Sequence, residues 1–206
     1  MRSQTDIKTY FRAGRRSCWL PAFAGMTISM MLVTSVSAAD DTAHWKMLTD
    51  KSSIKWSVNY SGKAVDGMFP SFTSDIAFDP AHLDTSSVNV SINTAKATST
   101  DSDAQASIAG GEWLAASQYP AAVFKSSGFS HLSRDNYQAD GMLSLRGKTV
   151  KVSLPFTLKI TGHNAAMDGT ITLKRLDFGV GTGEWAKTDA VANDVKVTVH
   201  VEAINN

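Results

Sequence analysis

The stretch from Val150 to Ile160 reads VKVSLPFTLKI. Every even-numbered residue in it is apolar, whereas Lys151, Ser153 and Lys159 are among the odd-numbered ones. Successive side chains of a β-strand point to opposite faces, so this pattern predicts a strand with one face buried and the other in water. It is the longest unbroken alternation in the chain and the best guide to its fold.

The same period-two pattern recurs along most of the chain. The further segments that carry it are 53–60, 65–69, 72–78, 88–92, 123–129, 137–145, 167–173 and 195–203. Glycine-containing turns separate several of them, as at Gly147-Lys148 and Gly162-His163-Asn164. Eight or nine strands joined mainly by turns predict one antiparallel all-β domain. A short helical segment is expected at about 103–119, interrupted by Gly110-Gly111.

Two all-β architectures fit these strands. An eight-stranded antiparallel barrel removes exposed strand edges and leaves an interior that holds side chains or one small ligand. A two-sheet sandwich of the immunoglobulin type has a similar number of strands. The alternations, several of them near ten residues long, favour tilted strands of a barrel. The inward positions are almost all apolar, which predicts an apolar occupant.

The amino terminus has the features of an export signal. Arg15-Arg16 precedes an uncharged stretch of 23 residues that ends in Ser35-Val36-Ser37-Ala38-Ala39. Small residues of this kind are typical of a signal-peptidase site, so we expect a signal peptide at 1–39 and a periplasmic domain at 40–206. A retained membrane anchor and a twin-arginine route are the alternatives. Met26, Met30 and Met31 are alternative starts, which would make the gene start over-extended.

Composition excludes several classes of protein. Hydrophobic residues make up 43% of the 206-residue chain and charged residues 19%, unlike a disordered or polytopic membrane protein. After the first sixteen residues the chain carries 15 basic and 18 acidic side chains, which argues against nucleic acid as a partner. Cys18 is the only cysteine and lies in the leader, so disulfides and cysteine metal sites are excluded from the domain.

Motifs for catalysis or metal binding are weak. The five histidines are scattered without zinc-site spacing, and we expect no metal. Gly179-Val180-Gly181-Thr182-Gly183 superficially resembles a phosphate-binding loop, but a connection at the barrel rim is the better interpretation. No Gly-x-Ser-x-Gly nucleophile motif is present, although a triad assembled by folding stays open. The sequence therefore favours a binding protein over an enzyme.

Several short stretches together resemble the YceI-like, polyisoprenoid-binding family of bacterial periplasmic proteins. The resemblance runs from about Trp45 to Ala203, and its motifs follow the family's order and spacing. They are Ser53-Ile54-Lys55-Trp56, Gly67-Met68-Phe69 with Phe72, Ile76-Ala77-Phe78-Asp79-Pro80, Val88-Asn89-Val90-Ser91-Ile92, Gly111-Glu112-Trp113-Leu114, Tyr119-Pro120-Ala121-Ala122-Val123-Phe124-Lys125-Ser126, Gly141-Met142-Leu143-Ser144-Leu145-Arg146-Gly147 and Arg175-Leu176-Asp177-Phe178-Gly179-Val180-Gly181.

The resemblance implies a lipocalin-like eight-stranded barrel whose bore holds the prenyl tail of an isoprenoid quinone or a similar polyprenyl lipid. Two departures concern the polar head. Many relatives carry a histidine where this chain has Tyr60, and many carry charged residues and a histidine where it has 106–110. The Gly183-Glu184-Trp185 ending resembles a branch of the family associated with membrane cytochrome b561.

These inferences lead to one functional prediction. The protein is expected to bind, transport or sequester an isoprenoid lipid or quinone in the periplasm, with no catalytic residues, no metal and no other cofactor. The alternative is a non-enzymatic accessory module of a membrane redox protein such as cytochrome b561, with a packed core; a homodimer stays open. The residues expected to line the bore are Trp56, Val58, Tyr60, Phe69, Phe72, Phe78, Val90, Ile92, Phe124, Leu143, Leu145, Leu154, Phe156, Leu158, Leu173, Phe178 and Trp185.

Overall fold

A computed structural model describes residues 42–205, and the predicted signal peptide at 1–39 lies outside this range. Strands make up most of the described chain. They are β1 (His44–Met47), β2 (Ser53–Tyr60), β3 (Lys63–Phe69), β4 (Phe72–Ala77), β5 (Ser87–Asn93), β6 (Thr98–Ser99), β7 (Ala121–Ser133), β8 (Asn136–Leu145), β9 (Lys148–Thr161), β10 (Asn164–Lys174) and β11 (Val191–Ile204). One α-helix, α1 (Ser102–Ser107), and four 3₁₀ turns complete the fold: η1 (Thr49–Lys51), η2 (Thr94–Lys96), η3 (Arg175–Phe178) and η4 (Gly183–Ala186).

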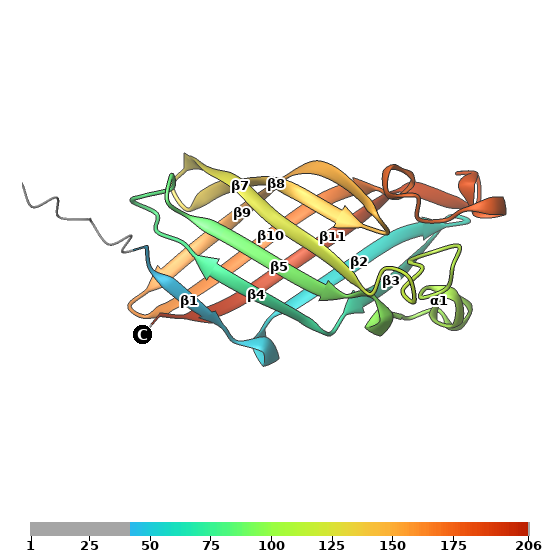
Figure 1. Ribbon diagram of the computed structural model, residues 1–206, viewed down its shortest axis with the longest axis horizontal. Coiled ribbons are helices and arrows are strands. Elements are labelled where there is room, and N and C mark those ends of the chain that lie inside the picture. Colours follow the sequence, from blue (N-terminus) through green and yellow to red (C-terminus); the bar gives the residue numbers. More distant parts are fainter. Residues whose placement is uncertain (1–41, 206) are drawn as a thin grey trace, which may run out of the picture. The chain divides into compact units, whose positions relative to one another are not determined.

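The sheet closes into a ring through its first strand. β1 pairs with β4, where Trp45 lies opposite Ile76, and also with β11, where Lys46 lies opposite Ile204. The other strands follow in the order β4-β5-β7-β8-β9-β10-β11, and all the pairings are antiparallel. The closed eight-stranded antiparallel barrel is therefore confirmed and the sandwich is excluded (Figure 1).

The first two strands occupy one position in this ring. β11 pairs with β2 over Val191–His200 and with β1 at Ala203 and Ile204, and η1 interrupts the strand between them. In the same way β3 continues into β4 after Pro70-Ser71. The strand predicted at 53–60 is β2, and it fills only part of this position in the ring, because β1 fills the rest. Strand β1 was missed because four residues are too few to show a period.

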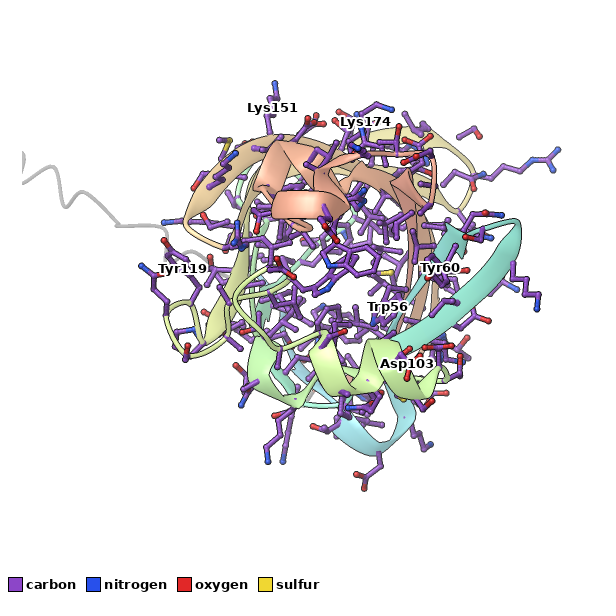
Figure 2. The ribbon with its side chains drawn as sticks, turned by 90° about the vertical axis from the view of Figure 1, so that its right-hand side faces the viewer. Trp56, Tyr60, Asp103, Tyr119, Lys151 and Lys174 are labelled. Atoms are coloured by element: carbon purple, nitrogen blue, oxygen red, sulfur yellow. The ribbon has the colours of Figure 1, made fainter. Side chains whose placement is uncertain are left out.

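The long strand β9 has the orientation that its sequence predicts. Val152, Leu154 and Phe156 point into the barrel, while Lys151 is exposed and points away from it (Figure 2). Residues paired across neighbouring strands point to the same side of the sheet, and Phe156 is paired with Tyr137 on β8 and with Gly169 on β10. A shift of one residue would turn every apolar side chain of β9 into water, so burial fixes the register.

The helical part of the segment expected at about 103–119 is confined to α1. Asp101 begins this helix, because its Oδ1 accepts hydrogen bonds from the backbone of Asp103 at 3.0 Å and Ala104 at 2.9 Å. After Ile108 the chain continues as turns through the glycine pair and reaches β7 at Ala121. Glycine in a helix interior is unfavourable, which explains why the helix is short.

Aromatic side chains fill the end of the barrel that lies away from α1. Phe78 packs edge-on against Phe129 at 5.1 Å and against Phe156 at 6.3 Å between ring centroids, and Tyr137 stacks on Phe156 at 5.7 Å. Trp45 joins this cluster and donates from its Nε1 to the carbonyl of Phe78 at 2.8 Å. Because these rings meet in close contact, they form a solid floor to the barrel interior.

Candidate functional site

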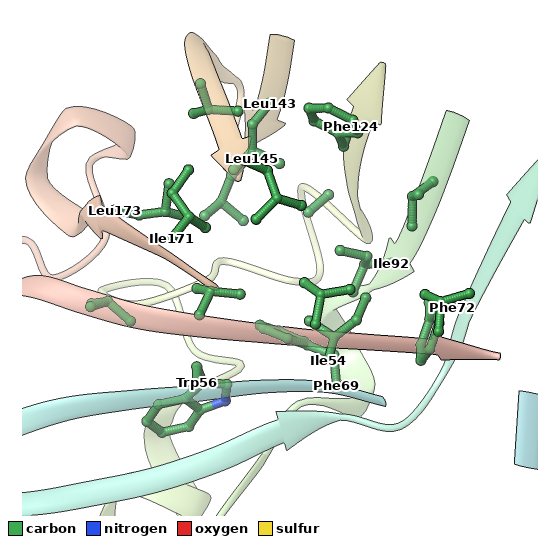
Figure 3. A pocket seen from close by; sticks show the side chains of 18 of the residues that line it. Ile54, Trp56, Phe69, Phe72, Ile92, Phe124, Leu143, Leu145, Ile171 and Leu173 are labelled. Carbon is green, nitrogen blue, oxygen red and sulfur yellow. The ribbon is translucent and has the colours of Figure 1, made fainter. Parts of the chain in front are cut away.

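Above the aromatic floor the barrel encloses a cavity of about 710 Å³. Its walls come from strands all around the ring, and their apolar side chains converge on one open space (Figure 3). Small-molecule sites typically have volumes of roughly 300–1,000 Å³ and mainly apolar walls. The cavity therefore has the size and the surface of a binding site for an apolar molecule.

All the residues expected to line a bore lie in the wall of this cavity. They are brought together from η3, η4, eight strands and Phe78, which directly follows β4. Four of them also belong to the aromatic floor or pack against it, namely Phe78, Phe124, Phe156 and Leu158. Filling the space at Leu158 would therefore compress the floor, whereas Leu173 lies in the wall away from it.

The prediction from the sequence did not include the inward-facing residues of β11, which form one side of the cavity wall. On β11 the cavity is lined by Val191 and, after a register shift, by every second residue from Val195 onward: Val195, Val197, Val199, Val201 and Ala203. The alternation that predicts this strand already contained the signal for Val195–Ala203. Residues of α1 and Trp113 were also omitted, and no periodic pattern marks them because they cover the end of the barrel rather than forming its wall.

The end opposite the floor carries the mouth of the cavity. Looking into this end, α1 lies on one side and the segment around η3 and η4 on the other (Figure 2). Trp113 and Trp185 meet between the two segments, with ring centroids 5.4 Å apart. Most of the polar cavity-lining groups are here, in Asp101, Asp103 and other residues of α1 and η3. The site is thus apolar inside and polar at its entrance.

Hydrogen bonds tie the two covering segments together. The backbone carbonyl of Glu112 accepts from Gly181 N and Thr182 N at 2.9 Å each, and its Oε2 accepts from Trp185 Nε1 at 3.1 Å. Arg146 donates from Nη2 to the carbonyl of Gly111 at 2.6 Å and from Nη1 to that of Gly179. These contacts fix the position of Trp185 beside the mouth.

Arg175 is a buried cation in this end of the wall, with 3% of its surface exposed. Its guanidinium donates to five backbone carbonyls at 2.9–3.5 Å: those of Val180, Gly181, Lys187, Val191 and Ala192. The guanidinium carbon also lies 5.9 Å from the centroid of Trp113. Burial lowers the pKa of Arg175, but arginine keeps its proton in proteins. Its donors are therefore occupied in holding the loop before β11.

Two aromatic residues of β2, Tyr60 and Trp56, lie at different depths between the mouth and the interior of the barrel. Tyr60 stands at the outer end of β2 and is 41% exposed. Trp56 lies deeper on the same strand and is only 8% exposed, with its indole inside the barrel behind α1 (Figure 2). Gly67 lies opposite Trp56 on β3, and a Cβ there would approach the indole to 2.2 Å. The absence of a side chain at Gly67 thus makes room for the ring.

The other motifs have structural positions. Gly179 and Gly181 adopt φ angles of 68° and 82° in the connection between η3 and η4, a left-handed conformation that favours glycine. His82 Nδ1 and His200 Nδ1 form hydrogen bonds of 2.7 Å with the carboxylates of Asp79 and Asp168. Within 42–205 no group of three or more His, Cys, Asp or Glu residues is placed to hold a metal ion, and no helix is long and apolar enough to cross a membrane.

Comparison with known proteins agrees with this architecture. Residues 45–203 match the family of the YceI-like domain. The chain belongs to the YceI-like family. A UPF0312 protein of Vibrio cholerae is 26% identical over 188 residues, which span 87% of this chain and 96% of that protein.

Solved structures share the fold of this chain. The crystal structure of BcnA from Burkholderia cenocepacia has 30% sequence identity and a TM-score of 0.73, covering 76% of this chain and 99% of BcnA. A polyisoprenoid-binding domain from Saccharophagus degradans, implicated in plant cell wall breakdown, has a TM-score of 0.61. It covers 80% of this chain and 99% of that domain at 9% identity, so it shows the shared fold alone.

Proposed function

We propose that this YceI-like protein binds an isoprenoid lipid, a quinone or a polyprenyl chain, and carries or sequesters it in the periplasm. The observation that carries the proposal is the apolar cavity, closed by an aromatic floor and bordered by polar groups at its mouth. The polyisoprenoid-binding domain of Saccharophagus degradans, with the same barrel, supports this choice of ligand.

The hydrophobic effect supplies the driving force for such binding. Each methylene moved from water into the cavity contributes roughly 0.8 kcal/mol, so a few isoprene units give tight binding. The conformational entropy that the prenyl tail and the cavity side chains lose on binding offsets part of this gain. A ligand held mainly by apolar contact needs no cofactor and no reaction. The polar groups at the mouth already have structural partners, since Asp101 caps α1 and Arg175 holds five carbonyls, and this supports binding rather than catalysis.

The accessory-module alternative assumed a core filled by the protein's own side chains. Only the floor fits that description, and the cavity above it favours a carrier. Docking to a membrane cytochrome b561 and formation of a homodimer stay predictions. Co-purification from membranes and the mass in solution would test them.

Mass spectrometry of an organic extract of the purified protein tests the proposed function. We expect one prenyl lipid in near-stoichiometric amount, released when the protein unfolds. An extract without lipid, together with failure to take up added prenyl quinone, would refute the carrier.

Amino-terminal sequencing of the periplasmic fraction tests the location, and the expected first residue is Ala39 or Asp40. Recovery only in membranes with residues 1–39 intact would refute it.

A further inference from the structure

Among the described residues, the cavity wall contains one buried side-chain hydrogen-bond donor without an acceptor. Among the buried side-chain nitrogen and oxygen atoms of residues 42–205, only Trp56 Nε1 and Arg146 Nε lack a partner. Arg146 does not line the cavity, whereas Trp56 does. Two other indoles of the wall are satisfied, since Trp45 donates to Phe78 and Trp185 to Glu112. Trp56 Nε1 is therefore the buried donor of this wall that has no acceptor within the described part of the protein.

A buried donor without an acceptor destabilises a folded protein, and such a group calls for an explanation. A leucine or phenylalanine at this position would cover the same apolar surface without that cost. The chain instead accommodates the full indole, because β3 has a glycine opposite it, with the ring over Gly67 and next to the Thr98 carbonyl. This packing fixes the ring, so the direction of its N–H is fixed as well.

The depth of Trp56 places the donor inside the barrel. Tyr60 lies at the rim, and Trp56 precedes it by four residues on β2, or roughly 13 Å of strand at about 3.3 Å per residue. Ile54 and Phe69 lie still deeper beside it, in the apolar part of the wall (Figure 3). An acceptor that reaches Trp56 must therefore enter the bore rather than stay in the water at the mouth.

We propose that Trp56 Nε1 donates a hydrogen bond to an oxygen of the bound lipid. The inference rests on the proposed function and specifies the ligand further, as an isoprenoid with an acceptor oxygen such as a quinone carbonyl. The head then lies inside the mouth at the level of Trp56, and the prenyl tail fills the space down to the aromatic floor. The rim residues Tyr60 and Trp185 are left without a direct role in binding the head.

The test compares two ligands with the delipidated protein. A prenyl quinone carries acceptor oxygens, and squalene is an isoprenoid hydrocarbon with none. In a ¹⁵N–¹H spectrum of the indole groups we expect the Trp56 signal to move downfield with the quinone and not with squalene. The signal is assigned with Trp56→Phe or, if that variant does not fold, by elimination with Trp45→Phe, Trp113→Phe and Trp185→Phe. Equal Trp56 shifts with both ligands would overturn the inference.

Affinities provide the second readout. In Trp56→Phe we expect the quinone-to-squalene affinity ratio to fall about three- to tenfold, the effect of one net hydrogen bond. Loss of ring volume affects both ligands and cancels in the ratio. An unchanged ratio in Trp56→Phe, or a fall in Tyr60→Phe instead, would overturn the inference and leave the carrier intact. Failure of both ligands to bind the wild-type protein would refute the proposed function itself.

Discussion

Arg175 shows how a single residue organises the mouth. The guanidinium is buried without an acidic partner among the described ion pairs, and five carbonyls surround it. Those carbonyls belong to the loop that carries η4 and to the start of β11. Planar geometry and five donors make arginine the side chain that can satisfy all of them at once.

Replacing Arg175 with Met should destabilise the fold by about 2–4 kcal/mol, because buried carbonyls lose their donors. Arg175→Lys should lie between Met and the wild type, since an ammonium has three donors rather than five. Urea unfolding measures both. The neighbouring Lys174→Met is the control, as this exposed side chain makes only a surface ion pair with Asp194 and should change the midpoint little. Equal midpoints for all the proteins would contradict the structural role of Arg175.

Gly67 offers a second test at single-residue scale. An added Cβ would lie 2.0 Å from the Thr98 carbonyl and 2.2 Å from the Trp56 ring, so Gly67→Ala must displace one of them. We expect a loss of about 1–3 kcal/mol in unfolding free energy, the usual effect of overpacking. Gly128→Ala is the matched control, since nothing lies within 4 Å of its Cβ position. Similar stabilities of the two variants would show that the ring is not held as described.

Among the elements, the turn between β4 and β5 contains a titratable pair. Asp79 Oδ2 and His82 Nδ1 are 2.7 Å apart, and Asp79 Oδ1 also accepts from the backbone of Ala81 at 2.8 Å. The hydrogen bond to Asp79 raises the pKa of His82 above its ordinary 6.5, and the bond from His82 lowers the pKa of Asp79 below its ordinary 3.8. In mildly acidic solution both side chains are charged, and their ion pair stabilises this turn.

The sign of its pH dependence follows from these directions. The His82 contribution is complete below pH 6.5 and is lost as the pH rises through the raised pKa. The Asp79 contribution is complete above pH 3.8 and is lost as the pH falls through the lowered pKa. An NMR titration should give His82 a pKa above 6.5 that returns toward this value in Asp79→Asn. A pKa that is identical in both proteins would contradict the contact.

At the scale of the whole molecule, the barrel interior is divided between a packed floor and an open cavity. The two parts respond differently to an enlarged side chain. Overpacking a solid core typically costs 1–3 kcal/mol, whereas a larger side chain in an open bore occupies the space of the ligand. The position of a residue along the barrel axis thus decides whether a substitution affects stability or binding.

Leu173→Trp and Leu158→Trp separate these cases. Leu173 lines the cavity away from the floor, so its replacement should abolish lipid uptake at nearly unchanged stability. Leu158 packs against the floor cluster, and its replacement should lower the unfolding free energy by about 1–3 kcal/mol. Lipid content by mass spectrometry and denaturant midpoints provide the two readouts. Strong destabilisation by Leu173→Trp would mean that the wall is packed rather than open.

The sequence by itself determined the longer strands and the side of each that faces inward, although it did not show the short strands β1 and β6. Alternation in β9 and β11 is a local property, because burial of one face requires an apolar residue at every second position. The same rule predicted the bore residues that lie on strands, because an inward-facing side chain of a closed barrel points into its interior. Phe178 and Trp185 lie in η3 and η4, outside any alternating segment, and were expected from the aromatic residues and the family resemblance.

Only the tertiary structure decided where the interior is solid and where it is open. The floor depends on Phe78, Phe129 and Phe156 meeting across three separate segments, and no local pattern encodes such a meeting. The buried Arg175 and the unpaired Trp56 Nε1 are likewise defined by their neighbours, which lie on other strands and loops. Local periodicity reports the face of a strand, whereas packing and hydrogen bonding depend on contacts that form only when the barrel closes.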